Sequence, residues 1–95
     1  MIGSLKQIFG MQTANKQITI SPDYFLDCQE TSFTVAILRL TMQMNQMKTG
    51  ECIEFRSVDP DCKSFLNAWL KKSGNELLLF DDKTIKTAVI QKKGN

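Results

Sequence analysis

The side chains in this sequence best suited to chemistry are three thiols, Cys28, Cys52 and Cys62, and the sequence contains no histidine. An odd number of cysteines without a Cys-x-x-Cys pair argues against a disulfide framework and against a thiolate zinc site. The lack of histidine excludes Ser-His-Asp and Cys-His catalysis as well as imidazole metal ligation. We therefore expect reduced thiols, no metal and no cofactor. Acid–base chemistry would need a carboxylate or a lysine with a strongly shifted pKa.

Length and charge narrow the class of protein. The chain has 95 residues, enough for one domain with a modest core, and its 42% hydrophobic and 23% charged residues are ordinary for a globular protein. A net charge of +2 is too small for a nucleic-acid footprint, and the pairs Lys71-Lys72 and Lys92-Lys93 are interpreted as solvated ends of elements. No stretch approaches the roughly 20 apolar residues of a membrane span. We expect a cytoplasmic protein, monomeric or homodimeric, without direct contact to membrane or nucleic acid.

Residues 1–20 are interpreted as an N-terminal extension of a domain that spans residues 21–95. Ile2, Leu5 and Phe9 stand at helical spacing, but Lys6 and Gln7 interrupt what would be the apolar segment of a signal peptide. A short amphipathic helix that docks or frays is therefore expected over residues 1–11. Gln17–Ile20 is a candidate extra strand before a turn at Ser21-Pro22-Asp23, or the first part of one strand that Pro22 interrupts.

A helix is predicted over residues 33–48, after a strand at Tyr24–Cys28. Ser32 or Thr31 is available to cap this helix, and Gly50 to end it. The helical period of 3.6 residues assigns one apolar face to the core. That face consists of Phe33, Ile37, Leu40, Met44 and Met47.

Three apolar residues, Val35, Leu38 and Met42, fall on nearly the opposite side of the same helix. Either another layer covers them or they form an exposed apolar strip. Such a strip marks an interaction surface when it is not covered. We assign Val35, Leu38 and Met42, with the neighbouring Thr34, as candidate partner-binding residues.

The second half of the chain predicts strand, helix, strand, strand. Glu51–Val58 alternates as a half-buried strand does, and Asp59-Pro60 is the predicted start of a helix, with Asp59 as N-cap and Pro60 in its first position. This helix is expected to bury Cys62, Phe65, Leu66 and Trp69, to reach about Ser73 and to end at Gly74. Two more strands, Glu76–Phe80 and Thr84–Gln91, are joined by a predicted tight turn at Asp81–Lys83.

These elements predict an α+β fold of the order β-α-β-α-β-β. Two helices would cover one face of a four-stranded mixed sheet, giving a two-layer α/β sandwich with an N-terminal extension. That arrangement buries every apolar stripe except the strip of Val35, Leu38 and Met42.

With these elements in place, the sequence resembles the TusA family of small sulfur carriers, also called SirA-like. The resemblance runs without a gap from Leu26 to Leu78. The matching positions are Leu26-Asp27, Leu38-Arg39-Leu40, Gly50-Glu51, Asp59-Pro60, Trp69, Gly74, Glu76, Leu77 and Leu78.

The resemblance implies a protein that carries sulfur as a cysteine persulfide, received from a cysteine desulfurase and passed on towards tRNA thiolation or other sulfur metabolism. That chemistry uses a Cys-Pro-x-Pro motif at the start of the first helix, where the helix dipole lowers the pKa of the thiol. Here the motif reads Phe33-Thr34-Val35-Ala36, so the nucleophile and both prolines are absent. Glu30 also replaces the glycine usual in the preceding loop.

Three hypotheses follow for the function. The first is a non-catalytic interaction module that binds a protein partner through Val35, Leu38 and Met42, unless residues 1–20 of the same chain cover that strip. The second retains sulfur transfer on another thiol, either Cys28 or Cys62, of which Cys62 falls in the first turn of a helix. The third, nucleic-acid binding, lacks an aromatic stacking platform among the basic residues.

Overall fold

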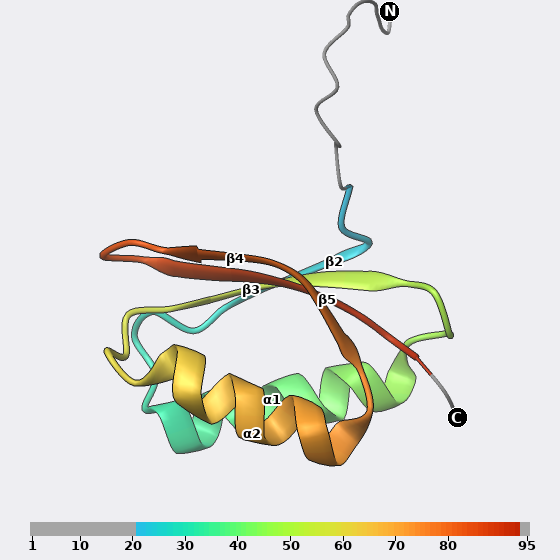
Figure 1. Cartoon of the computed structure of the whole chain (residues 1–95), viewed down its shortest axis with the longest axis horizontal. Helices are drawn as coiled ribbons and strands as arrows, with labels where there is room; N and C mark the ends of the chain where they lie inside the picture. Colours follow the sequence, from blue (N-terminus) through green and yellow to red (C-terminus); the bar gives the residue numbers. More distant parts are fainter. Residues whose placement is uncertain (1–20, 94–95) are drawn as a thin grey trace, which may run out of the picture.

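The computed structural model describes residues 21–93, which form two helices and one four-stranded sheet in two layers (Figure 1). The elements in chain order are β2 (Tyr24–Asp27), α1 (Phe33–Gln46), β3 (Cys52–Ser57), α2 (Cys62–Ser73), β4 (Glu76–Asp82) and β5 (Lys86–Gln91). The predicted α+β class and the order β-α-β-α-β-β are confirmed. The helix predicted over residues 1–11 and the strand predicted at Gln17–Ile20 lie outside the described residues.

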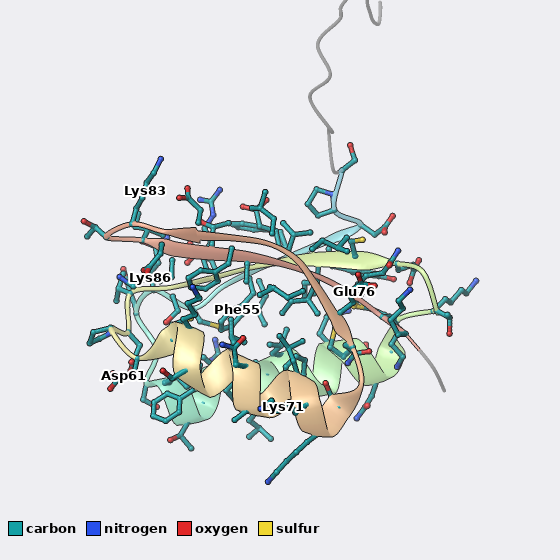
Figure 2. All side chains as sticks on the ribbon, in the orientation of Figure 1. Phe55, Asp61, Lys71, Glu76, Lys83 and Lys86 are labelled. Atoms are coloured by element: carbon teal, nitrogen blue, oxygen red, sulfur yellow. The ribbon has the colours of Figure 1, made fainter. Side chains whose placement is uncertain are left out.

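The sheet has the strand order β2-β3-β5-β4, and both helices lie on one of its faces (Figure 1). β2 pairs with β3 in parallel, and β5 pairs with β3 and β4 in antiparallel fashion. The sheet is therefore mixed, as predicted. The inward side chains of the two central strands, Ile53 and Phe55 of β3 with Ala88 and Ile90 of β5, are fully buried against the helices. Figure 2 shows Phe55 between the two layers.

Helix α1 begins at Phe33 because Ser32 caps it: the Ser32 hydroxyl oxygen accepts a hydrogen bond from the Val35 backbone N–H at 3.4 Å. Its buried face contains Leu40 and Met44, as predicted, and also the small residue Ala36. The helix ends at Gln46, so the prediction that Gly50 ends it is wrong. Gly50, with φ of +96°, instead forms the tight turn into β3, where a left-handed residue is required.

Helix α2 begins two residues later than the sequence predicts. Asp59 does not cap the helix; its carboxylate accepts the backbone N–H of Asp61 at 2.8 Å and so forms a separate turn around Pro60. Asp61 is the residue at the cap position, and Cys62 is the first helical residue. Gly74 ends α2 in the left-handed conformation, with φ of +76°, which confirms that prediction.

The turn between the last two strands lies later in the chain than the sequence predicts: β4 extends two residues further, to Asp82, and β5 begins two residues later than the predicted Thr84, at Lys86. Asp81 and Asp82 pair with Thr87 and Lys86 in the β4–β5 ladder, so the turn lies at residues 83–85 and the prediction of a turn at Asp81–Lys83 is wrong. An ion pair joins these strand ends: the Lys86 ammonium lies 3.4 Å from the carboxylate of Asp82, its partner in the ladder.

Candidate functional site

The first residue of α1 is held by aromatic packing. The centroid of the Phe33 ring lies 5.2 Å from that of Phe65 on α2, with the planes tilted by 34°, and 6.4 Å from that of Phe55, edge to face. Phe33 therefore seals the end of the core where α1, α2 and β3 meet. Its side chain has no atom able to act as a nucleophile, an acid or a base.

Beside Phe33, a shallow apolar hollow of about 330 Å³ runs between the two helices. The hollow is lined by Phe33, Thr34, Ile37, Phe65 and Trp69. The prediction that Phe65 is buried is wrong, since 49% of its surface is exposed. The size and lining of the hollow suit one large apolar side chain of a partner.

The apolar surface continues from this hollow onto the outer side of α1. Val35, Leu38 and Met42 are 40%, 59% and 57% exposed, so none of the described residues covers the strip that the helical period predicts. Thr34, also exposed, stands between the strip and the hollow. We call the hollow and the strip together the helix patch; their juxtaposition forms one apolar surface across both helices.

Trp69 fixes the spacing of the two helices under the patch. Its indole Nε1 donates a hydrogen bond to Oγ1 of Thr41 at 3.1 Å, and the Thr41 hydroxyl in turn donates to the Ile37 carbonyl oxygen at 2.9 Å. The polar atom of the Trp69 side chain is thereby satisfied by α1 while its ring lines the hollow. The patch is therefore built on two helices held in a defined position.

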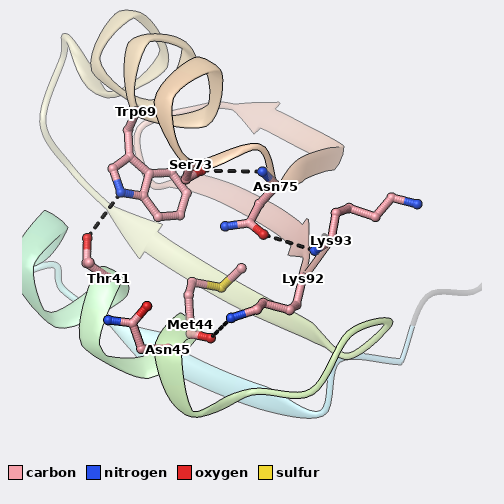
Figure 3. Close-up of a pocket in the computed structure, with 8 residues that line it drawn as sticks. All are labelled: Thr41, Met44, Asn45, Trp69, Ser73, Asn75, Lys92 and Lys93. Atoms are coloured by element: carbon pink, nitrogen blue, oxygen red, sulfur yellow. Dashed lines mark hydrogen bonds between the residues drawn. The ribbon is translucent and has the colours of Figure 1, made fainter. Parts of the chain in front are cut away.

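A second, polar hollow of about 320 Å³ lies at the C-terminal ends of the helices, again beside Trp69 (Figure 3). Its polar groups are largely engaged with one another. The Lys92 ammonium donates to the Met44 carbonyl oxygen at 2.7 Å, and the Lys93 backbone N–H donates to the Asn75 side-chain oxygen at 2.9 Å. The first bond gives a donor to a carbonyl group in the last turn of α1, and the second connects the residues after β5 to the residues after α2. Both bonds therefore have a structural role.

The three thiols are buried. Cys28 follows β2 and Cys62 begins α2, and both have no exposed surface, while Cys52 in β3 is 8% exposed. Burial raises the pKa of each thiol above its ordinary value; that of Cys62 rises to about 11 in spite of a hydrogen bond from Ser57. A thiol with a raised pKa and no solvent access is a poor nucleophile at neutral pH.

Neither a group of metal ligands nor a membrane-spanning helix is found in the described part of the chain. Residues 21–93 contain no group of three side chains placed to hold a metal ion. Neither described helix has the length and apolar character that crossing a membrane requires.

Sequence patterns locate the strip but miss the hollow. Periodicity within one helix places Val35, Leu38 and Met42 on a common face, whereas the hollow depends on Phe33 and Phe65 from different helices. One feature of the sequence indicates that Phe65 is partly exposed. It lies one residue before the buried Leu66, at the border of the apolar face of α2 rather than at its centre.

Comparison with known proteins gives one informative relationship. No family model matches the chain. The chain is 32% identical over 56 residues to a protein of Bacillus subtilis (strain 168) named "Putative sulfur carrier protein YrkI". The matched residues are 59% of this chain and 75% of that relative.

Proposed function

Because this chain belongs to the TusA/SirA-like family of sulfur carriers, we propose that it is a non-catalytic member, a protein-interaction module that uses the carrier fold for docking. One observation supports this most directly. The resemblance implies that the persulfide cysteine of the family corresponds to Phe33, and in this structure Phe33 is the first residue of α1 and packs on Phe65. An aromatic ring cannot attack a persulfide. The helix patch, by contrast, offers an exposed apolar surface on which a partner could dock.

The alternative is a working sulfur carrier that uses Cys28 or Cys62 as the persulfide site. In that reaction the thiolate attacks the outer sulfur of a donor persulfide, a new S–S bond forms on the protein, and the donor leaves as a thiolate. Either thiol would have to become exposed to solvent, and it would have to lose its proton although burial raises its pKa. These two requirements favour the docking role.

Sulfur loading separates the two functions. We expect the wild-type protein, incubated with a small persulfide donor and measured by intact mass, to gain no sulfur, while Phe33→Cys in the same experiment gains one. A wild-type adduct that disappears in Cys28→Ser or in Cys62→Ser would establish the carrier role instead.

Docking is tested with substitutions on the strip. Leu38→Glu and Met42→Glu place charge on side chains that are more than half exposed, so the fold is expected to tolerate both. In a pull-down from the native host, both variants are expected to lose one specific protein that the wild type retains. Leu79→Glu, the same change at a leucine of β4 that is 47% exposed and lies on the sheet, serves as the matched control and is expected to keep the partner. If both strip variants keep every partner, the strip is not the docking surface.

A further inference from the structure

The helix layer that carries the patch contains basic residues and no acidic ones. Within α1 the only charged residue is Arg39, and within α2 the charged residues are Lys63, Lys71 and Lys72. The nearest acidic residue along α2 is Asp61, which precedes its first turn. The helices themselves therefore contain only positive charge, concentrated at the C-terminal end of α2 in Lys71 and Lys72, whereas Asp27 and Glu30 line the same polar hollow as Arg39.

None of these four cations forms an ion pair within the described residues, and one of them, Lys63, lies over the ring of Phe80 with its ammonium 5.9 Å from the centroid. The ion pairs between described residues are Arg56–Glu54, Lys83–Asp81, Lys86–Asp82 and Lys93–Glu76, all on the strands or their ends. Arg39, Lys71 and Lys72 are exposed and form no ion pair with any of residues 21–93. Figure 2 shows Lys71 on the helix layer and Lys83 at the hairpin turn of the sheet.

The charge of the helix layer distinguishes three candidates that could cover the patch: residues 1–20 of the same chain, a second copy of the chain, and another protein. Residues 1–20 contain Lys6 and Lys16 and no acidic residue, so this segment has the same sign as the helix layer. A second copy docked face to face would bring a second helix layer of the same sign, because the helices of each copy contain basic residues and no acidic ones. Like charges across an interface disfavour association. Both forms of self-coverage are therefore less favourable than a partner of opposite charge.

We propose that the helix patch binds an acidic amphipathic helix of another protein. A large apolar side chain of that helix fills the hollow beside Phe33 and Phe65, and its apolar stripe covers Leu38 and Met42. Its carboxylates lie at the rim, near Arg39 and Lys72. This inference rests on the proposed docking function and specifies its partner by chemistry.

A designed peptide tests the charge and the hollow together. The probe is a helical peptide of about 18 residues with leucine on one face, glutamate on the other and no tryptophan. Trp69 is the one tryptophan of the chain and lines the hollow, so its emission reports binding directly. We expect saturable binding of the glutamate peptide, and at least tenfold weaker binding of the same peptide with lysine in place of glutamate.

Matched variants identify the contact. Lys72→Glu is expected to weaken binding about fivefold, whereas Lys83→Glu, an equal charge change at the exposed hairpin, leaves it unchanged. Binding should also weaken when salt is raised from about 0.1 M to about 1 M, because the Debye length falls from about 10 Å to about 3 Å. Equal effects of the two lysine variants, or equal binding of both peptides, would overturn the proposal.

Other occupants give distinct results. A Trp69 response to anionic lipid vesicles without a response to the glutamate peptide would make the ligand a membrane surface. A wild-type dimer that Leu38→Glu dissociates in sedimentation would make it a second copy. Either result overturns the acidic-helix proposal and leaves the sulfur-loading result intact. A sulfur adduct on the wild type would overturn the non-catalytic role without changing the peptide titration.

Discussion

The indole of Trp69 and the hydroxyl of Thr41 join the two helices through a hydrogen bond of 3.1 Å. It is the contact that keeps the floor of the hollow in place, because Trp69 lines the hollow and Thr41 is anchored to the Ile37 carbonyl. The bond also separates the apolar hollow on one side of Trp69 from the polar hollow on the other, which Thr41 helps to line.

Thr41→Val is expected to reduce the free energy of unfolding by about 1 kcal/mol, because it leaves the partly buried indole N–H without its acceptor. Urea denaturation followed by Trp69 emission measures this change. Thr34→Val is the matched control: Thr34 is exposed on the same helix, and its stability change is expected to stay within about 0.5 kcal/mol. Equal effects of the two variants would show that the hydrogen bond does not hold the helices together.

Two leucines of α1, two positions apart, test which side of the helix is buried. Leu40 has no exposed surface, whereas Leu38 is 59% exposed. Leu40→Ala is expected to cost about 2–5 kcal/mol of unfolding free energy, and Leu38→Ala less than about 0.5 kcal/mol. Equilibrium denaturation in urea measures both. A large cost for Leu38→Ala would mean that another part of the protein covers the strip.

The sequence predicts well those features that one element encodes by itself. The helical period of residues 33–48 identifies both the buried Leu40 and Met44 and the exposed Leu38 and Met42. Gly74 is recognisable as a helix end because few other residues adopt a positive φ at low cost. The order of strands and helices follows from the alternation of these periods.

Features that depend on two elements, or on competing local signals, are not predictable in this way. Asp59 and Asp61 flank Pro60, and either can precede a helix; the hydrogen bond between them decides the start of α2. Asp81 and Asp82 resemble a turn by composition, but the pairing with β5 extends the strand through them. The hollow requires Phe33 and Phe65 from separate helices, and helical periodicity carries no information on that contact.

Alkaline pH is expected to destabilise the protein through Cys62. Its pKa in the folded state is about 11, above the ordinary value of 9.0, because of burial. Between these values the folded protein keeps the thiol proton that the unfolded chain loses, so stability is complete below about pH 9 and falls as pH rises to about 11. The loss attributable to this group is at most about 3 kcal/mol.

The measurement is the urea midpoint from pH 8 to about pH 11 for the wild type and for Cys62→Ala. Every other titratable group is the same in both proteins, so the difference between the two curves isolates Cys62. The wild-type curve should fall more steeply. Parallel curves would mean that the Cys62 thiol ionises as readily in the folded protein as in the unfolded chain.

Phe33→Cys is expected to create a reactive thiol where the native protein has none. The new side chain would stand at the first residue of α1, where the free backbone N–H groups and the helix dipole favour a thiolate, so its pKa should lie below the ordinary value. The rate of modification by a disulfide reagent, measured against pH, reports that pKa. The native wild-type protein should react only slowly, since all three of its thiols are buried.

Leu38→Cys supplies the comparison, because it exposes a thiol in the middle of the same helix, away from its N-terminus. A lower pKa at position 33 than at position 38 would show that the fold retains the electrostatic environment of a carrier site and that the phenylalanine alone removes the nucleophile. Equal pKa values would mean that the altered surroundings, including Glu30 in the preceding loop and the absence of both motif prolines, have removed that environment as well.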